Sequence, residues 1–329
     1  MQGVQVMKGV VHLKSRIISL ISAAALLTSC GTAQSASYDR DADDSLKVVC
    51  TAFAYYDWTR NIAEGSGTEI TYLLSDGVDM HSFQPTARDL AAVLECDVLI
   101  YGGGESEQLL TDACNNSPDE NRIVLPLLDD DALAEEIVEG MQSEEESDDE
   151  DEAESDEHIW LSPKRAALCC EKIEKALTEA DGAHAELYRS NDESYIGRLD
   201  VLDKKCSSAA GGTIIVADRF PFLYLARDYG IDYYAAFPGC SAESEASFET
   251  VSFLTGKCSE TDAKTIYIID GSDGKLANTV AGGCENAPEI KELDSMQSVS
   301  ASEIESGADY IGIMEKNIGI LSGADASNG

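Results

Sequence analysis

The sequence predicts an α/β fold made of two lobes, each built on a parallel β-sheet and joined by one long linking helix. Short, apolar, β-rich runs alternate with segments of helical apolar spacing, which is typical of parallel sheets with crossover helices. This alternation occurs in two sets, with a long helical stretch between them. The chain has 329 residues, 43% of them hydrophobic, so each lobe can bury its own core.

Four candidate strands define the first lobe, which we place at residues 46–162. They are KVVCTAF (47–53), EITYLL (69–74), DVLIYGG (97–103) and RIVLPL (122–127). The segments between them, YDWTRNIAEG, TARDLAAVLE and SEQLLTDAC, carry apolar residues at helical spacing. The pattern therefore predicts a β-α unit repeated along the lobe.

The linking helix is predicted over residues 163–208, because Pro163 suits a first helical turn and apolar residues then recur at helical spacing. A break is expected near Asp181-Gly182. The second lobe, residues 209–322, repeats the alternation and ends in a helical pattern after residue 300. Its candidate strands are TIIVAD (213–218), DYYAAFP (232–238), TIYIID (265–270) and EIKELDS (289–295). Parallel sheets present ligands at the carboxyl ends of their strands.

The N-terminus indicates export. Three basic residues precede an apolar stretch at 17–27, which is too short to span a bilayer core of roughly 30 Å. We therefore interpret residues 1–29 as a signal peptide. The sequence LTSC resembles the lipobox of bacterial lipoproteins, so Cys30 is the predicted lipidation site and residues 30–45 a flexible tether. The alternative is an ordinary signal peptide with a chance cysteine. The predicted location is the outer face of the cytoplasmic membrane, with a lipid anchor.

The chain is strongly acidic, with a formal net charge of −39. Residues 129–157 contain seventeen of the 62 acidic residues and no Lys or Arg. Like charges repel, so we expect a disordered loop there. A surface of this charge repels nucleic acid and attracts cations, which excludes nucleic-acid binding.

The cysteines do not indicate a metal site by their spacing. Nine remain beside Cys30, and no CxxC motif is present. An odd number in an exported chain leaves at least one outside intramolecular pairs. Several lie in apolar segments and are expected to be small core residues.

Two of the four histidines are candidate metal ligands. His81 follows the candidate strand at 69–74, and His158 directly follows the acidic run. Both lie in predicted loops, where a packed core histidine is less common than on an apolar helix face. His12 is lost with the signal peptide, and His184 on the linking helix is expected to be exposed and inert.

The motifs VDMHSFQPTARDL, IYGGGESEQL, EHIWLSP and LDSMQSV resemble the metal-receptor family of bacterial ABC importers, the solute-binding lipoproteins for zinc and manganese. The similarity runs from about Lys47 to Leu321. It implies a metal site in the cleft between the lobes, with His81 and His158 as ligands and Asp294 as a carboxylate ligand. It also implies a cargo of Zn²⁺, with Mn²⁺ as the alternative, and a cognate permease and ATPase as partners.

The third family ligand is the point where this sequence departs from the pattern. The matching stretch, IIVADRFPFLYLARDYGI, contains no histidine. Asp218 is the nearest replacement, although Ala217 could align there, and Asp218 could instead pair with Arg219 or cap the following helix. Glu243 or a water are further candidates. The predicted ligand set is His81, His158, Asp218 and Asp294.

Such a set suits Zn²⁺ or Mn²⁺. It leaves no open position for a reactive water, which favours a carrier over an enzyme. Two alternatives are an acidic surface adhesin on the same fold and a secreted metallohydrolase. The second lacks an HExxH motif. We expect a monomer.

Overall fold

The computed structural model describes residues 45–129, 133, 138–142, 155–209, 211–241 and 245–323. The predicted signal peptide, the predicted lipidation site Cys30 and the predicted tether up to residue 44 lie outside the described residues. Most of the acidic segment 129–157 lies outside them as well. Within the described residues, no helix combines the length and apolar character needed to cross a membrane.

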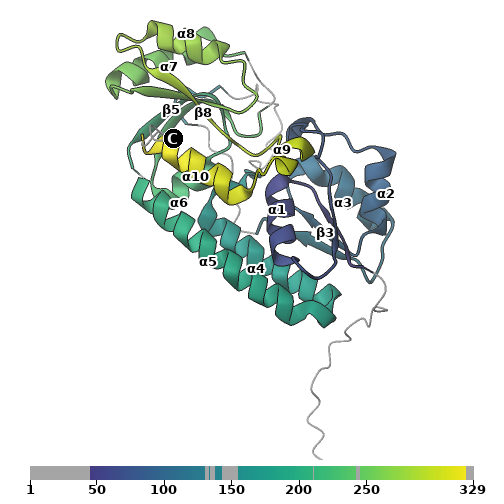
Figure 1. Ribbon diagram of the computed structural model, residues 1–329. Coiled ribbons are helices and arrows are strands. Elements are labelled where there is room, and N and C mark those ends of the chain that lie inside the picture. The colour runs from purple at the N-terminus through teal and green to yellow at the C-terminus, as the bar shows by residue number, and fades with distance from the viewer. Residues whose placement is uncertain are drawn as a thin grey trace, which may run out of the picture. The chain divides into compact units, whose positions relative to one another are not determined.

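The first lobe contains a four-stranded parallel sheet in the order β2-β1-β3-β4. The first three strands are each followed by an α-helix that packs against the sheet (Figure 1). The strands are β1 (Lys47–Cys50), β2 (Glu69–Tyr72), β3 (Val98–Tyr101) and β4 (Ile123–Pro126). The helices are α1 (Phe53–Ile62), α2 (Ala87–Glu95) and α3 (Gln108–Asn116). Each strand is one to three residues shorter at its carboxyl end than the sequence predicts, because the chain there already turns towards the next helix or loop.

The second lobe repeats this topology, with a parallel sheet in the order β6-β5-β7-β8. Its strands are β5 (Thr213–Phe220), β6 (Asp232–Pro238), β7 (Thr265–Ile269) and β8 (Glu289–Leu293). Its helices are α6 (Leu223–Tyr229), α7 (Phe248–Glu260) and α8 (Lys275–Gly283), followed by α9 (Ala301–Glu305) and α10 (Tyr310–Leu321). The two sheets confirm the predicted α/β class with two parallel-sheet lobes. In each sheet the strand order reverses beside the first strand, which is where such folds bind ligands.

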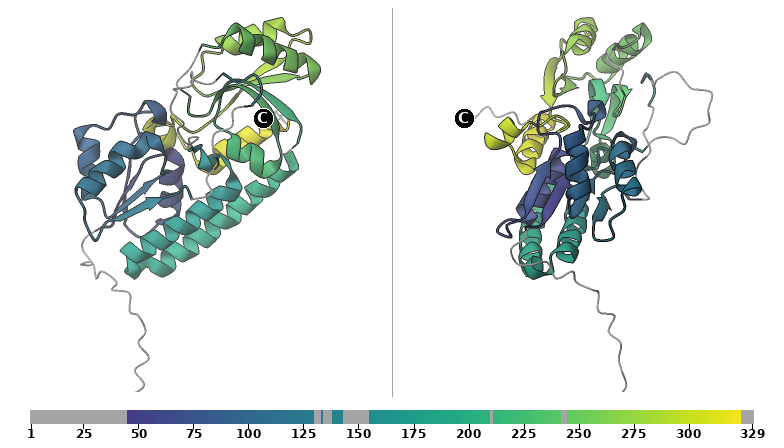
Figure 2. Two further views of the ribbon diagram at one scale, coloured as in Figure 1. Left: turned by 180° about the vertical axis from the view of Figure 1, so that it is seen from behind. Right: turned by 90° about the vertical axis from the view of Figure 1, so that its right-hand side faces the viewer.

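The linking segment contains two helices, so the prediction of one helix over 163–208 needs correction. Helix α4 (Pro163–Ala180) and helix α5 (Ala185–Ala209) run side by side in all views (Figures 1 and 2). They are separated by a 3₁₀ turn at Gly182–His184, where the sequence predicts a break. Asp181 has a non-helical backbone, and its side chain accepts a hydrogen bond from the backbone N–H of Ala183 at 3.2 Å. This local hydrogen bond competes with helix continuation.

One continuous apolar core runs through both lobes. It includes Val48 from the first sheet, Val216 from the second, and Trp160 and Tyr310 from the segments between and after them. Helix α10 packs against α1 and α5. The buried carboxylate of Asp57 on α1 accepts hydrogen bonds from the backbone N–H of Tyr310 and the hydroxyl of Tyr195, both at 3.2 Å. The C-terminal helix is thereby tied to the first lobe.

Parts of the acidic segment have defined contacts, which differs from the expectation of disorder across 129–157. The backbone N–H of Gln142 donates to the carbonyl of Ala236 at 2.9 Å, and its side-chain oxygen accepts from the N–H of Ser247 at 2.7 Å. Asp156 and Glu157 are buried. Buried carboxylates need hydrogen-bond partners, so the C-terminal end of the segment is held by the fold and does not behave as part of a solvated run.

Candidate metal site

Four polar side chains reach one place between the lobes, and each follows an edge strand of its sheet. His81 lies in the loop after β2, and His158 lies on the segment after β4. Cys240 follows β6 directly, and Gln297 follows β8. Because all strands of a parallel sheet end at the same side, the loops that leave these ends can converge although their residues are distant in sequence.

His81 is held by Asp79. The Asp79 side chain caps a 3₁₀ turn (Met80–Ser82) and accepts a hydrogen bond from the His81 backbone N–H at 3.0 Å. Its other oxygen accepts from the Arg219 guanidinium of the second lobe at 2.8 Å. Burial, and then the charge of His158, lower the pKa of His81 to about 3. The ring is therefore neutral at pH 7 and can offer a lone pair to a cation.

His158 is fully buried and is oriented by Asp156. One Asp156 oxygen accepts from the His158 backbone N–H at 2.8 Å and lies 3.1 Å from the ring Nδ1. With Nδ1–H donating to this carboxylate, the Nε2 atom carries the lone pair that binds metals. The adjacent Glu157 accepts from the Ser106 backbone N–H at 3.0 Å. These contacts fix the two residues before the histidine and its own backbone N–H.

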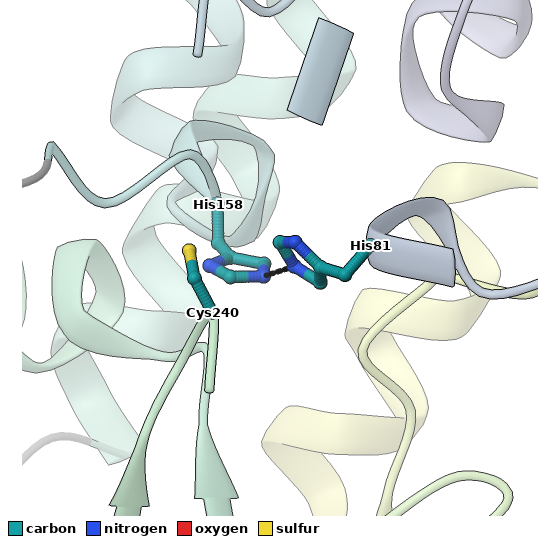
Figure 3. Close-up of side chains that lie close together, drawn as sticks. All are labelled: His81, His158 and Cys240. Carbon is teal, nitrogen blue, oxygen red and sulfur yellow. Dashed lines mark hydrogen bonds between the residues drawn. The ribbon is translucent and has the colours of Figure 1, made fainter. Parts of the chain in front are cut away.

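The two imidazole rings face each other with their Nε2 atoms 3.1 Å apart (Figure 3). Ligand atoms of His81, His158 and Cys240 all lie within 4.8 Å of one another. Two nitrogen ligands bound tetrahedrally at about 2.0–2.1 Å from a zinc ion stand about 3.3 Å apart. The observed separation of the two Nε2 atoms is close to this value.

Asp218 and Asp294, the other two predicted ligands, do not join this group among the described residues. Asp218 accepts from the backbone N–H of Arg219 at 2.9 Å, and its second oxygen is buried without a hydrogen-bond partner there. Asp294 accepts from the backbone N–H of Met296 at 2.9 Å. Their role as ligands therefore stays a prediction, and Glu243 lies outside the described residues.

The alternative roles considered for Asp218 also differ from the structure. The Arg219 guanidinium binds Asp79 rather than its neighbour. Helix α6 begins after Phe222, with no side chain capping it. A register shift in β5 between Val216 and Arg219 places Asp218 at an irregularity of the strand, where residue alternation no longer predicts the direction of a side chain.

Gln297 is a site residue that the sequence reasoning missed. Its side chain is 2% exposed, and its Nε2 lies 2.6 Å from Nε2 of His158. Its Oε1 has no hydrogen-bond partner among the described residues. Gln297 lies in the motif LDSMQSV, three residues after Asp294, which the resemblance indicates as the ligand. Cys240 was missed because FPGCSAESEASFET reads as a polar loop.

Gly239 determines how closely the second lobe approaches His158. A Cβ atom there would lie 2.9 Å from the carbonyl oxygen of Phe220 and 3.1 Å from both Asp156 Oδ2 and His158 Cε1. We expect Gly239→Ala to displace the carboxylate–imidazole pair and to weaken zinc binding by about tenfold, the lower end of what a disturbed outer shell costs. Isothermal titration of the purified variant measures this.

Gly197→Ala is the matched control, because nothing lies within 4 Å of the added Cβ on helix α5. It should leave zinc affinity unchanged and raise stability slightly, since alanine favours a helix over glycine. Equal affinities for the two variants would show that the position of His158 does not depend on the Gly239 contact.

A two-lobed α/β fold with a pair of oriented histidines between its lobes defines a metal-binding solute receptor. The family model described as zinc-uptake complex component A periplasmic (ZnuA) matches residues 48–324, so the chain belongs to this family. This confirms the predicted family. Its members are zinc-binding solute-binding proteins and not enzymes, which agrees with the prediction.

The sequence relatives carry zinc in their names. The zinc-binding lipoprotein AdcA of Streptococcus pneumoniae is 28% identical over 292 residues, covering 87% of this chain and 57% of AdcA. The chain thus spans little more than half of that relative. The high-affinity zinc uptake system protein ZnuA of Bacillus subtilis is 26% identical over 303 residues, covering 90% of this chain and 92% of that protein.

Solved structures agree on the fold. The Zn(II)-bound ZnuA-like domain of Streptococcus pneumoniae AdcA superposes with a TM-score of 0.68 at 25% identity, covering 85% of this chain and 98% of that domain. The periplasmic zinc-binding protein TroA of Treponema pallidum gives a TM-score of 0.68 at 20% identity, covering 85% of this chain and 99% of that one. The second likeness shows the fold alone.

Proposed function

We propose that this chain captures a divalent transition metal, Zn²⁺ in preference to Mn²⁺, and delivers it to the permease and ATPase of an ABC importer. The observation that carries this proposal is the pair of imidazoles, buried His158 and partly buried His81, whose Nε2 atoms lie 3.1 Å apart between the lobes. Family membership and the zinc-binding relatives support it. In this proposal His81 and His158 are primary ligands, while Asp218 and Asp294 are candidates from the second lobe.

The proposal places the receptor outside the cytoplasmic membrane, on its outer face, as a monomer anchored through lipid on Cys30. The lipobox-like sequence and the name of the lipoprotein AdcA support the anchor. Two or more acyl chains give stable membrane attachment. The receptor would then stay beside its permease while the acidic surface raises the local concentration of cations.

Metal analysis of the purified protein tests the function. The protein is stripped with a chelator and titrated with Zn²⁺, and Mn²⁺ then competes for the site at fixed ionic strength. We expect one tightly bound zinc ion per chain and weaker competition by Mn²⁺, because imidazole ligands follow the general order of metal affinities. Absence of a stoichiometric site would refute the function, and preferential retention of Mn²⁺ would reverse the choice of cargo.

A further inference from the structure

The second lobe presents a thiol and an amide to the two histidines, where two carboxylates are expected from the sequence. We propose that Cys240 binds the ion as a thiolate beside His81 and His158, and that the amide oxygen of Gln297 supplies the fourth ligand. This inference rests on the proposed function and names the groups that determine its metal preference.

The position of Cys240 is set by the close contact that its neighbour makes. Gly239 lies against the imidazole of His158 so tightly that an added Cβ would be 3.1 Å from the ring. The next residue is therefore held beside the same ring, and its sulfur lies within 4.8 Å of ligand nitrogens of both histidines. Figure 3 shows the sulfur beside His158, at the end of strands of the second lobe, with His81 approaching from the other side.

Gln297 is an independent observation that points to a cation. Its amide is 2% exposed and directed at Nε2 of His158, while its oxygen has no hydrogen-bond partner among the described residues. A buried polar atom without a partner is unfavourable. A half-turn of the amide exchanges its oxygen and nitrogen, so that the oxygen is directed at the imidazole. A cation bound by both groups would hold these atoms about 3.3 Å apart, so the amide would move back by about 0.7 Å on binding.

The carboxylate nearest to His81 is already engaged. Asp79 binds the Arg219 guanidinium at 2.8 Å and the His81 backbone with its other oxygen. The Arg219 charge lies close to the site, and Asp79 neutralises it. The groups that remain available as ligands are therefore two imidazoles, a thiolate and an amide.

This ligand set predicts selectivity for a soft ion. Thiolate ligands favour Zn²⁺, whereas Mn²⁺ prefers oxygen ligands. When Zn²⁺ binds, the Cys240 thiol loses its proton to the solvent and the sulfur lone pair forms the bond to the ion. A set with Asp218 and Asp294 in these positions would carry two negative charges from oxygen and would accept Mn²⁺ more readily.

The test uses the purified full chain and Co²⁺ as a spectroscopic probe for zinc sites. We expect a near-ultraviolet charge-transfer band from thiolate to Co²⁺ in the parent protein and its loss in Cys240→Ser. Zinc affinity should fall by about 100-fold in this variant, since loss of a ligand exceeds the effect of an outer-shell change, while Mn²⁺ affinity should change little. Cys114→Ser, on helix α3 of the first lobe, is the matched control and should keep the band and the affinity.

Gln297→Leu keeps the size of the side chain but removes its oxygen. It should keep the thiolate band and weaken zinc binding by more than about tenfold, since loss of a ligand exceeds the effect of an outer-shell change. If the parent protein binds Zn²⁺ without a thiolate band, and Cys240→Ser titrates like the parent, the Cys240 assignment is overturned while the proposed function stands. A large loss of affinity in Asp218→Asn, with none in Cys240→Ser, would likewise overturn it. Failure of the parent to bind either metal would instead refute the function itself.

Discussion

Replacing His158 with alanine should lower zinc affinity by more than about 100-fold, which corresponds to roughly 3 kcal/mol of binding free energy. The ring is fully buried, and Asp156 orients it so that Nε2 faces His81. No other imidazole among the described residues lies near enough to replace it. A competition titration with a chromogenic chelator measures the loss.

His81→Ala provides a second variant with less risk to the fold, because His81 is only partly buried. It should lose affinity to a similar degree. His184→Ala is the control, since His184 is 41% exposed and binds Asp181 at 2.6 Å far along the chain from the site. The site assignment is wrong if the His81 and His158 variants both titrate like the His184 variant while remaining folded.

Trp160→Ala should lower the free energy of unfolding of the metal-free protein by about 3–5 kcal/mol, the usual cost of removing a buried aromatic ring. Trp160 is 1% exposed, and its ring packs edge-on against Tyr55 with centroids 5.9 Å apart. Its indole N–H donates to the carbonyl of Ser295 at 2.9 Å, in the loop that carries Gln297. The substitution removes both a core side chain and a link between the lobes. Urea unfolding followed by circular dichroism measures the change.

Trp160→Phe separates these two effects. The phenyl ring retains much of the packing, while the hydrogen bond to Ser295 is lost. We expect a smaller loss of about 1–3 kcal/mol, typical of a buried acceptor left without its donor. A loss below 1 kcal/mol in the alanine variant would contradict the central position that we assign to this ring in the shared core.

The fold was largely predictable because parallel strands leave a strong pattern. The runs TIYIID and DVLIYGG contain the apolar stretches IYII and VLIY, as expected of strands covered on both faces, and these stretches lie in β7 and β3. The break at Asp181-Gly182 was also visible, because a short polar residue and a glycine disfavour a continuing helix. That this break separates two packed helices was not visible, since helix pairing depends on contacts distant in sequence.

Of the four predicted ligands, the described structure brings together only the two from the first lobe. His81 and His158 are rare residues in loops, and their motifs are distinctive. In the second lobe, Met296 adopts a left-handed backbone with φ of 59°, which is uncommon for a residue other than glycine. The chain bends there, and Gln297 rather than Asp294 is directed at His158. Neither this turn nor the register shift before Asp218 follows from residue alternation.

The apolar core that runs through both lobes limits how the receptor can change shape. Opening the lobes as two rigid halves would expose buried surface around Trp160 and Tyr310 to water, at a cost of about 25 cal/mol for each Å². The loop after β2 can move at a lower cost, because His81 is partly exposed there, whereas His158 and Gln297 are buried. Loading and unloading should therefore proceed by rearrangement of this loop over a fixed base. A permease would then recognise the loaded receptor by the conformation of a few loop residues. Displacement of one of these residues from the ion would release it.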